Sequence, residues 1–411
     1  MIEKRSSRPT NAAAPANDAN GSARRLALLF PGQGSQHVGM GKRIAEVSQA
    51  ARQIYAQADE ALGFRISRLC FDGSEEELED TINTQPAILT TSLAYLAYLR
   101  ERLQEQGRRL RPSLMAGHSL GQFTAAVAAD SLDFSDGLRL VLERGRIMAE
   151  WARTRPGGLA TILGLSDRAV RQVCREASAE GKVGVAVLNG PGQTVISGEA
   201  GPLQRAMALA RSRGGRVLRL PISVPGHTPL MRDAARELSR VVSSLPFREP
   251  NTPLVSNISA KLLTTAEEVR QELADQICAA VQWARCVAAM MNEGASSFVE
   301  VGPGHALSNL IRRITGEAEV LGTEDAADES LLKLTDAPGR VVAAARRVAG
   351  DRREARHRQG NQPADHRTAE ARRPLARDAA AHAHLSILLA LRHPAAVLRA
   401  GILVYPHERA S

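Results

Sequence analysis

The sequence is poor in aromatic residues and in cysteine, which narrows the classes of protein to consider. Only 3% of the 411 residues are Phe, Trp or Tyr. The four cysteines form no C-x-x-C pair and show no metal-ligand spacing, which argues against a structural zinc site. This usage favours a reducing cytoplasm, and we expect no metal. The cysteines are Cys70, Cys174, Cys278 and Cys286.

Long apolar runs are also missing. A helix that spans a bilayer needs about 18 uninterrupted apolar residues. The best candidate, residues 384–404, is interrupted by Arg392, His393, Pro394 and Arg399. Residues 1–24 lack the apolar core of a secretory signal, and we interpret them as a disordered leader. We therefore expect a cytoplasmic protein with no membrane partner.

Positive charge is concentrated at one end of the chain. The net charge is +9, but residues 326–411 alone contain 15 Lys and Arg against 9 Asp and Glu. That segment carries +6 of the total, which leaves the rest close to neutral at +3. The body also lacks the aromatic residues interleaved with basic ones that nucleic-acid-binding surfaces use. We therefore expect no nucleic-acid partner.

What the sequence does contain is a G-x-S-x-G motif at the end of an apolar run. Residues 114–116 are Leu-Met-Ala, and Gly-His-Ser-Leu-Gly follows at 117–121 before helix-forming residues. This strand-turn-helix pattern predicts a nucleophile elbow that lifts the Ser119 hydroxyl above the sheet edge. The Leu120 N–H and the helix N-terminus would then face a developing oxyanion. The motif also occurs by chance in Gly- and Ser-rich loops, so other residues must support it.

Patterns on either side of the motif predict an α/β fold. Residues 26–30 form a continuous apolar run, which is typical of a buried strand in a parallel sheet. The glycine-rich residues 31–36 lack the spacing and the lysine of a P-loop, so we expect a tight turn there. We predict one helix over residues 40–62 and another that starts at 83–86, with its proline near the first turn. From 157 to 220 short strands and helices alternate in a βαββαβ-like unit.

Four separated motifs follow one another along the chain. They are F-P-G-Q-G-S-Q at 30–36, G-H-S-L-G at 117–121, R-G-R-I-M at 144–148 and V-P-G-H at 224–227. In this order and spacing they resemble the malonyl-CoA:acyl carrier protein transacylases and the related acyltransferase domains of fatty acid and polyketide synthases. The likeness continues through V-G-P-G at 301–304 and covers about residues 25–325.

The resemblance implies an architecture of two parts. Residues 25–151 and 221–325 would form a large α/β-hydrolase-like domain with a parallel sheet. Residues 152–220 would form an inserted ferredoxin-like small subdomain. No metal or redox cofactor is implied.

The resemblance also implies roles for individual residues. Ser119 would be the acylated nucleophile and His227 its general base, oriented by a backbone carbonyl at Gln276 without a carboxylate. The backbone N–H groups of Gln33 and Leu120 would form the oxyanion hole. The substrate-binding positions would be Arg144, His118, Gln85, Met148 and Asn189.

Arg144 is the residue that distinguishes a malonyl transferase from an esterase or thioesterase. It lies 25 residues after Ser119, as the malonate-binding arginine of the family does. It shares a predicted helix with Arg139 and Arg146, and arginines on such a helix are ordinarily solvated. A planar guanidinium suits a carboxylate bidentately, whereas an esterase or thioesterase would have no use for it.

Two residues depart from the family pattern. Many relatives carry Glu after the second elbow glycine, where this chain has Gln122; the missing charge near a helix N-terminus is worth up to about 1 kcal/mol, and we expect the change to be tolerated. Gly226 stands before the histidine, where relatives often carry Ser or Phe. This residue bears on which acyl groups are accepted.

The predicted function is transfer of malonyl from malonyl-CoA to the phosphopantetheine thiol of acyl carrier protein through a malonyl-Ser119 ester. We expect a cytoplasmic monomer that supplies fatty acid biosynthesis. The alternatives are a serine hydrolase or thioesterase acting on acyl-CoA, and the same transferase serving polyketide synthesis. A non-catalytic carrier-protein docking module is a further rival, against which His227 and Arg144 argue.

Residues 326–411 change abruptly to a composition of Arg, Ala, His and Pro. They are either a disordered basic tail or a frame-shifted reading of the next gene. A shift of one base over residues 350–362 permits a segment that resembles the glycine-rich dinucleotide loop of short-chain ketoacyl reductases. In either case, truncation after Asp325 is expected to retain stability and transfer activity.

Overall fold

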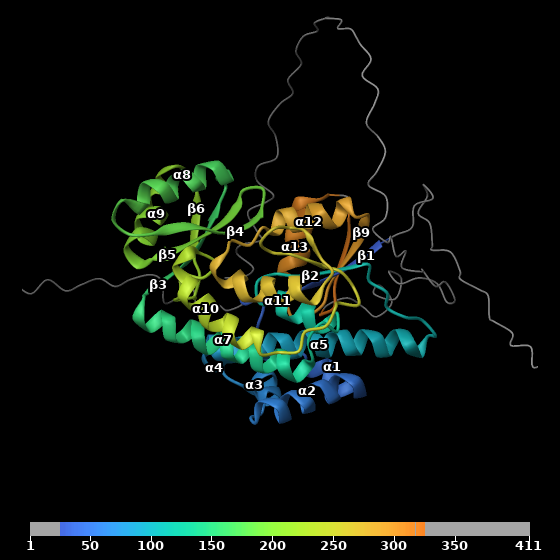
Figure 1. The fold of residues 1–411 in the computed structure, drawn as a ribbon. Coiled ribbons are helices and arrows are strands. Elements are labelled where there is room, and N and C mark those ends of the chain that lie inside the picture. The colour runs from blue at the N-terminus through green and yellow to red at the C-terminus, as the bar shows by residue number, and fades with distance from the viewer. Residues whose placement is uncertain (1–24, 317, 325–411) are drawn as a thin grey trace, which may run out of the picture. The chain divides into compact units, whose positions relative to one another are not determined.

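The computed structural model describes residues 25–316 and 318–324, so the expectations for residues 1–24 and 326–411 lie outside the described part of the chain. The described residues contain a six-stranded sheet with strand order β10-β9-β1-β2-β7-β8 (Figure 1). Its neighbouring strands are parallel except for the β7–β8 pair. The strands are β1 Arg25–Phe30, β2 Leu114–Gly117, β7 Leu254–Val255, β8 Leu262–Leu263, β9 Ala295–Glu300 and β10 Glu319–Gly322.

Helices cover both faces of this sheet (Figure 1). Within the described ranges, no helix is both long enough and apolar enough to cross a bilayer. The helices of this part are α1 Lys42–Val47, α2 Gln49–Leu62, α3 Ile66–Asp72, α4 Glu75–Glu79, α5 Thr81–Glu105, α6 Gly121–Ala128, α7 Phe134–Thr154, η2 Pro229–Met231, α10 Arg232–Ser243, α11 Ala266–Asp275, η3 Gln276–Cys278, α12 Trp283–Asn292 and α13 Ala306–Ile314.

Strand β1 shows why the apolar run at residues 26–30 is continuous. Its Leu28 and Phe30 pack in one core with α5, α6 and α7, while Ala27 and Leu29 pack in a second core with α12 and α13. Side chains of a strand alternate between the two faces of a sheet, so a strand with both faces covered is apolar at every position. The predicted buried parallel strand is confirmed.

A second, four-stranded sheet has strand order β4-β5-β3-β6 and is antiparallel throughout. Its element order is β-α-β-β-α-β, as the alternation over residues 157–220 predicts. The backbone of Val281 pairs with β4, since its N–H donates to Ala186 O and its carbonyl accepts from Leu188 N, both at 2.9 Å. The elements are β3 Gly157–Leu163, α8 Asp167–Ala177, η1 Ser178–Glu180, β4 Val183–Gly190, β5 Gln193–Glu199, α9 Ala200–Ser212 and β6 Arg216–Arg219.

Two of the predicted helices are wrong in detail. The single helix expected over residues 40–62 is two helices, because Ser48 is extended at φ −115° and its side chain accepts the Ala51 N–H as the N-cap of α2. The next helix begins at Thr81, capped by the Asp80 side chain, so Pro86 lies inside α5 and not in its first turn. The tight turn at Gln33 is confirmed, with Ser35 N donating to Gly32 O at 3.3 Å.

Candidate active site

Ser119 occupies the sharp turn between β2 and α6. Its φ of +53° lies in the left-handed region, where a serine is strained by about 1–3 kcal/mol. The two elbow glycines permit this geometry: a Cβ on Gly117 would lie 1.8 Å from the Gly121 carbonyl carbon, and one on Gly121 would lie 2.0 Å from Phe30 O. Only glycine fits at either position, so the sequence dictates the elbow locally.

His227 contacts the Ser119 hydroxyl directly. The Ser119 Oγ to His227 Nε2 distance is 2.6 Å, and His227 Nδ1 lies 3.0 Å from Gln276 O and 3.2 Å from Ala279 O. Because both partners of Nδ1 are carbonyl acceptors, Nδ1 carries the proton and Nε2 is left to accept the one on Oγ. Burial, together with the positive charge of Arg144, lowers the pKa of His227 to about 3. The imidazole is therefore neutral at physiological pH.

Arg144 is a buried cation beside the nucleophile. Its residue is 2% exposed, Nη1 donates to Gln85 Oε1 at 2.7 Å, and Nη2 donates to Ser119 Oγ at 3.4 Å. Phe123 lies below it, 5.2 Å from the guanidinium carbon to the ring centre. Within residues 25–316 and 318–324 no carboxylate pairs with it, and its Nε has no partner. Burial lowers its pKa to about 10, which leaves it charged at neutral pH.

Gln85 and Met148 hold the arginine in place. Gln85 Nε2 lies 3.1 Å from Thr81 Oγ1 and 3.5 Å from Met148 Sδ, so the carbonyl end of the amide is left to face the guanidinium. Thr81 Oγ1 in turn donates to Gln33 Oε1 at 3.3 Å. The structure thus brings these predicted pocket residues together around Arg144.

His118 and Asn189 link the elbow to the four-stranded sheet. His118 Nε2 lies 2.9 Å from Asn189 Oδ1, at the end of β4, and its ring packs edge-on against Trp283 at 5.3 Å. Burial lowers the pKa of His118, which favours the neutral ring. The four-stranded sheet therefore contributes Asn189 to the surroundings of the elbow.

The two predicted oxyanion donors lie at the carboxyl edge of adjacent parallel strands. Phe30 of β1 pairs with Gly117 of β2, so the turn at Gln33 and the elbow leave the sheet side by side. The contact is close, since a Cβ on Gly32 would lie 2.3 Å from His118 O. Leu120 is buried and immediately precedes α6, whose first three N–H groups donate to the carbonyls of residues 118–120 at 3.0 Å.

Sequence reasoning missed a group of buried polar side chains beneath the elbow. Gln122 bonds Gly117 N and Val255 O through its amide, and Asn257 bonds Ser119 N and Gly117 O, on the N-terminal side of the turn. Gln276 was predicted only for its carbonyl, yet its side-chain amide also donates to Ser119 O at 3.0 Å. One signal could have revealed Asn257: it follows an apolar strand at the sheet edge where parallel strands place functional residues.

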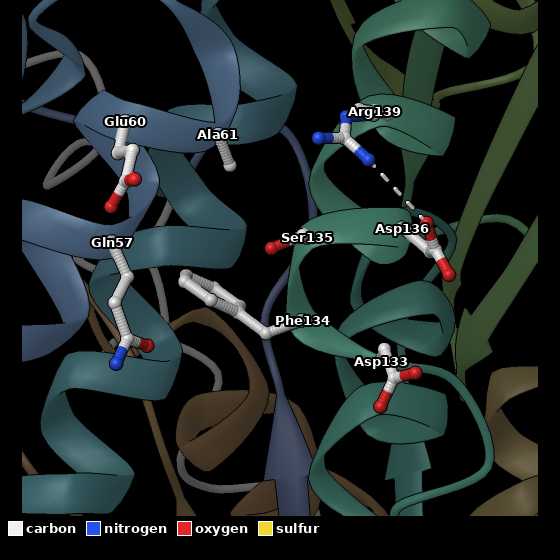
Figure 2. Close-up of a pocket in the computed structure, with 8 residues that line it drawn as sticks. All are labelled: Gln57, Glu60, Ala61, Asp133, Phe134, Ser135, Asp136 and Arg139. Carbon is white, nitrogen blue, oxygen red and sulfur yellow. Dashed lines mark ion pairs between the residues drawn. The ribbon is translucent and has the colours of Figure 1, made fainter.

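A separate hollow of about 720 Å³ lies on the surface between α2 and the start of α7 (Figure 2). None of the predicted site residues lines it. Figure 2 shows Arg139 of α7 turned toward Asp136, which agrees with its exposed, solvated position. The described residues contain no group of three His, Cys, Asp or Glu that could hold a metal ion. The hollow is lined mainly by Gln57, Glu60, Asp133, Phe134, Asp136 and Arg139.

A strained serine on a strand-turn-helix, hydrogen-bonded to a neutral histidine, is an arrangement that can support acyl transfer through a serine ester. The chain belongs to the acyl transferase domain family, whose model matches residues 27–337.

Individual relatives are similar over nearly their whole length. The chain is 39% identical over 303 residues to the malonyl CoA-acyl carrier protein transacylase of Bacillus subtilis (strain 168), which covers 73% of this chain and 94% of the relative. It is 41% identical over 292 residues to the protein of the same name from Escherichia coli (strain K12), with coverages of 71% and 93%. A solved malonyl-transacylase in complex with its type II polyketide synthase acyl carrier protein is 36% identical, with a TM-score of 0.71 over 75% of this chain and 98% of that one.

Proposed function

We propose that this protein transfers malonyl from malonyl-CoA to the phosphopantetheine thiol of acyl carrier protein, supplying fatty acid biosynthesis. The observation that carries the proposal is Arg144, a buried guanidinium without a carboxylate partner among the described residues, 3.4 Å from Ser119 Oγ. Leaving a buried charge unpaired is costly, so a site that keeps one is built for an anionic ligand. The free carboxylate of a malonyl group is that anion.

The first half-reaction acylates the serine. His227 Nε2 takes the Oγ proton while Oγ of Ser119 attacks the thioester carbonyl of malonyl-CoA. The N–H groups of Leu120 and Gln33 would stabilise the oxyanion of the tetrahedral intermediate. On collapse the C–S bond breaks, and the protonated His227 gives its proton to the departing coenzyme A thiol. A malonyl-Ser119 ester remains.

The second half-reaction runs the same steps in reverse with another thiol. His227 removes the proton of the phosphopantetheine thiol, whose sulfur attacks the malonyl-Ser119 ester. The serine leaves and regains its proton from His227. Both steps are exchanges between a thioester and an ester, so we propose that no metal or redox cofactor takes part.

We also infer the finer architecture. The crossover helices on both faces of the mostly parallel sheet and the elbow between β2 and α6 support an α/β-hydrolase-like large domain over residues 25–151 and 221–325. The β4-β5-β3-β6 order with α8 and α9 supports a ferredoxin-like subdomain over 152–220. We propose that the protein acts as a monomer in the cytoplasm.

Intact mass spectrometry after incubation with malonyl-CoA tests the proposal. Wild type is expected to retain a covalent malonyl group that Ser119→Ala lacks, and acyl carrier protein is expected to discharge it. A wild type without an adduct, or a Ser119→Ala variant with one, would contradict the mechanism. Rapid release of free malonate without carrier protein would favour the hydrolase alternative, and comparison of fatty acid and polyketide carrier proteins separates the two pathways.

A further inference from the structure

The Asn257 side chain lies directly beneath the elbow and is fully buried. Its Oδ1 accepts from Ser119 N at 2.9 Å and from Gln276 Nε2 at 3.1 Å. Its Nδ2 donates to Gly117 O at 2.7 Å and to Gln122 Oε1 at 3.2 Å. The amide thus uses both donors and both acceptor positions, and two of its four bonds go to the backbone that leads into the strained Ser119.

The two backbone partners determine which way the amide points. A Ser119 N–H can only donate and a Gly117 carbonyl can only accept, so Oδ1 must face the first and Nδ2 the second. No other side chain of the same size offers an acceptor and a donor in this arrangement. An aspartate would keep the bond to Ser119 N but would oppose a carboxylate oxygen to Gly117 O.

Glu272 holds the backbone that carries Asn257. This carboxylate in α11 is 5% exposed; Oε1 accepts from Asn257 N at 2.6 Å, and Oε2 accepts from Ser256 Oγ at 2.6 Å. Ile258 N adds a longer bond of 3.3 Å to Oε1. Among the described residues no Lys or Arg pairs with it. These hydrogen bonds of Glu272 therefore all go to residues 256–258.

The same segment also positions the base. Gln276 follows α11 by one residue, and its carbonyl accepts from His227 Nδ1 while its side chain donates to Ser119 O. Gln276 thus contacts both the serine and the histidine. Because Asn257 occupies the Ser119 N–H, that N–H is unavailable to an oxyanion, and the next N–H, of Leu120, is the one left facing the substrate.

We propose that Asn257, anchored by Glu272, is a positioning residue for acyl transfer: its amide holds the Ser119 turn so that Oγ meets His227 and the Leu120 N–H faces the oxyanion. This inference rests on the proposed function for the identity of the acyl group only. It assigns to Asn257 and Glu272 a part in the rate of acylation, separate from the binding of malonyl by Arg144.

The test compares Asn257→Asp and Asn257→Ala with wild type and with Asn292→Asp, an exposed asparagine at the end of α12. Two readouts are taken: kcat and KM for malonyl transfer, and the rate at which a fluorophosphonate probe labels Ser119. A misplaced nucleophile costs about 100-fold, so kcat and probe labelling should both fall by about that factor. KM for malonyl-CoA should stay within about threefold, since Arg144 is untouched.

Folded Asn257 variants with wild-type kcat, or with a raised KM alone, would overturn the proposal. If neither variant folds, Glu272→Ala decides: kcat should fall about tenfold at unchanged KM, since the amide remains but its backbone loosens. Glu272→Gln, which keeps an acceptor, should recover most of that rate, and wild-type kcat in Glu272→Ala would refute the inference. If wild type forms no malonyl adduct but the probe labels it faster than the Asn257 variants, the proposed function fails and the positioning role stands.

Discussion

The two sides of Ser119 are built differently. On the side proposed to face substrate, Arg144 has hydrogen-bonding groups without partners. Its guanidinium has no carboxylate partner in the described ranges, and its Nε makes no hydrogen bond. On the supporting side, Asn257 uses every donor and acceptor it has. A buried polar group without a partner costs free energy unless a ligand supplies one, whereas a fully bonded group makes its surroundings rigid. We interpret the contrast between Arg144 and Asn257 as one between a residue that binds substrate and a residue that positions the nucleophile.

Replacement of Arg144 tests the substrate side and should have the largest effect. In Arg144→Ala the malonyl carboxylate would be buried unpaired, which costs about 3–5 kcal/mol, or roughly 10²- to 5 × 10³-fold in kcat/KM. Acetyl transfer should suffer far less, because acetyl carries no charge. Steady-state kinetics with both coenzyme A esters measure the ratio; equal losses would show that Arg144 is structural.

The pH dependence of acylation tests whether the charge of Arg144 lowers the pKa of His227. The pKa of His227 is lowered to about 3, so kcat/KM for malonyl-CoA should not decline as the pH falls through 6.5. In Arg144→Ala the repelling charge is gone, and the acid limb should move to higher pH. Stopped-flow acylation from about pH 3 to 8, a range that includes both the lowered and the ordinary histidine pKa, measures it. An unmoved limb would contradict the assignment.

The same shift bears on stability. The unfolded chain binds a proton at His227 near pH 6.5 and the folded chain only near 3. The unfolded state therefore binds more protons in that window, so this residue lowers the free energy of unfolding progressively as the pH falls from 6.5 toward 3.

Gln122→Glu tests the supporting side, where a smaller effect is expected. A glutamate keeps the acceptor for Gly117 N, but it leaves Val255 O without a donor and adds a carboxylate to the network that contains Glu272. These costs exceed the gain of up to about 1 kcal/mol from a charge near the helix N-terminus, so we expect a net loss of about 1–2 kcal/mol in the free energy of unfolding, measured in urea. Gln49→Glu, at an exposed position of α2, is the control. If the double variant Gln122→Glu with Glu272→Gln regains part of the lost stability, charge repulsion is the cause. A Gln122→Glu variant as stable as wild type would refute this account.

The smallest effect is expected at the rim of the substrate side. A Cβ on the buried Gly226 would meet no atom within 4 Å, so the space beside His227 is open. Gly226→Phe should reduce kcat/KM for methylmalonyl-CoA a few-fold more than for malonyl-CoA, within about 1 kcal/mol of discrimination. Competition between the two esters measures it. A wild type that is wholly inactive with methylmalonyl-CoA would remove the basis for this prediction.

Patterns among neighbouring residues were enough to predict much of the fold and part of the site. The glycines of the elbow, the apolar run of β1 and the β-α-β-β-α-β alternation are readable because each depends on neighbours in the sequence. Ser48 and Pro86 show where this fails. A helix pattern continues through both positions, but Ser48 ends one helix and caps the next, and the Asp80 cap starts α5 well before Pro86.

The sequence by itself determined the candidate site residues Ser119, His227 and Arg144, since they lie in motifs whose order and approximate spacing resemble those of the family. The tertiary structure decided how far the arginines of α7 differ in burial: Arg144 is 2% exposed, while the Arg139 and Arg146 side chains are 63% and 60% exposed. It also decided that Asn257, 138 residues beyond Ser119, holds the nucleophile. Hydrogen bonds between residues so distant leave no periodic trace in the chain, because only the packing of the sheet brings their partners within reach.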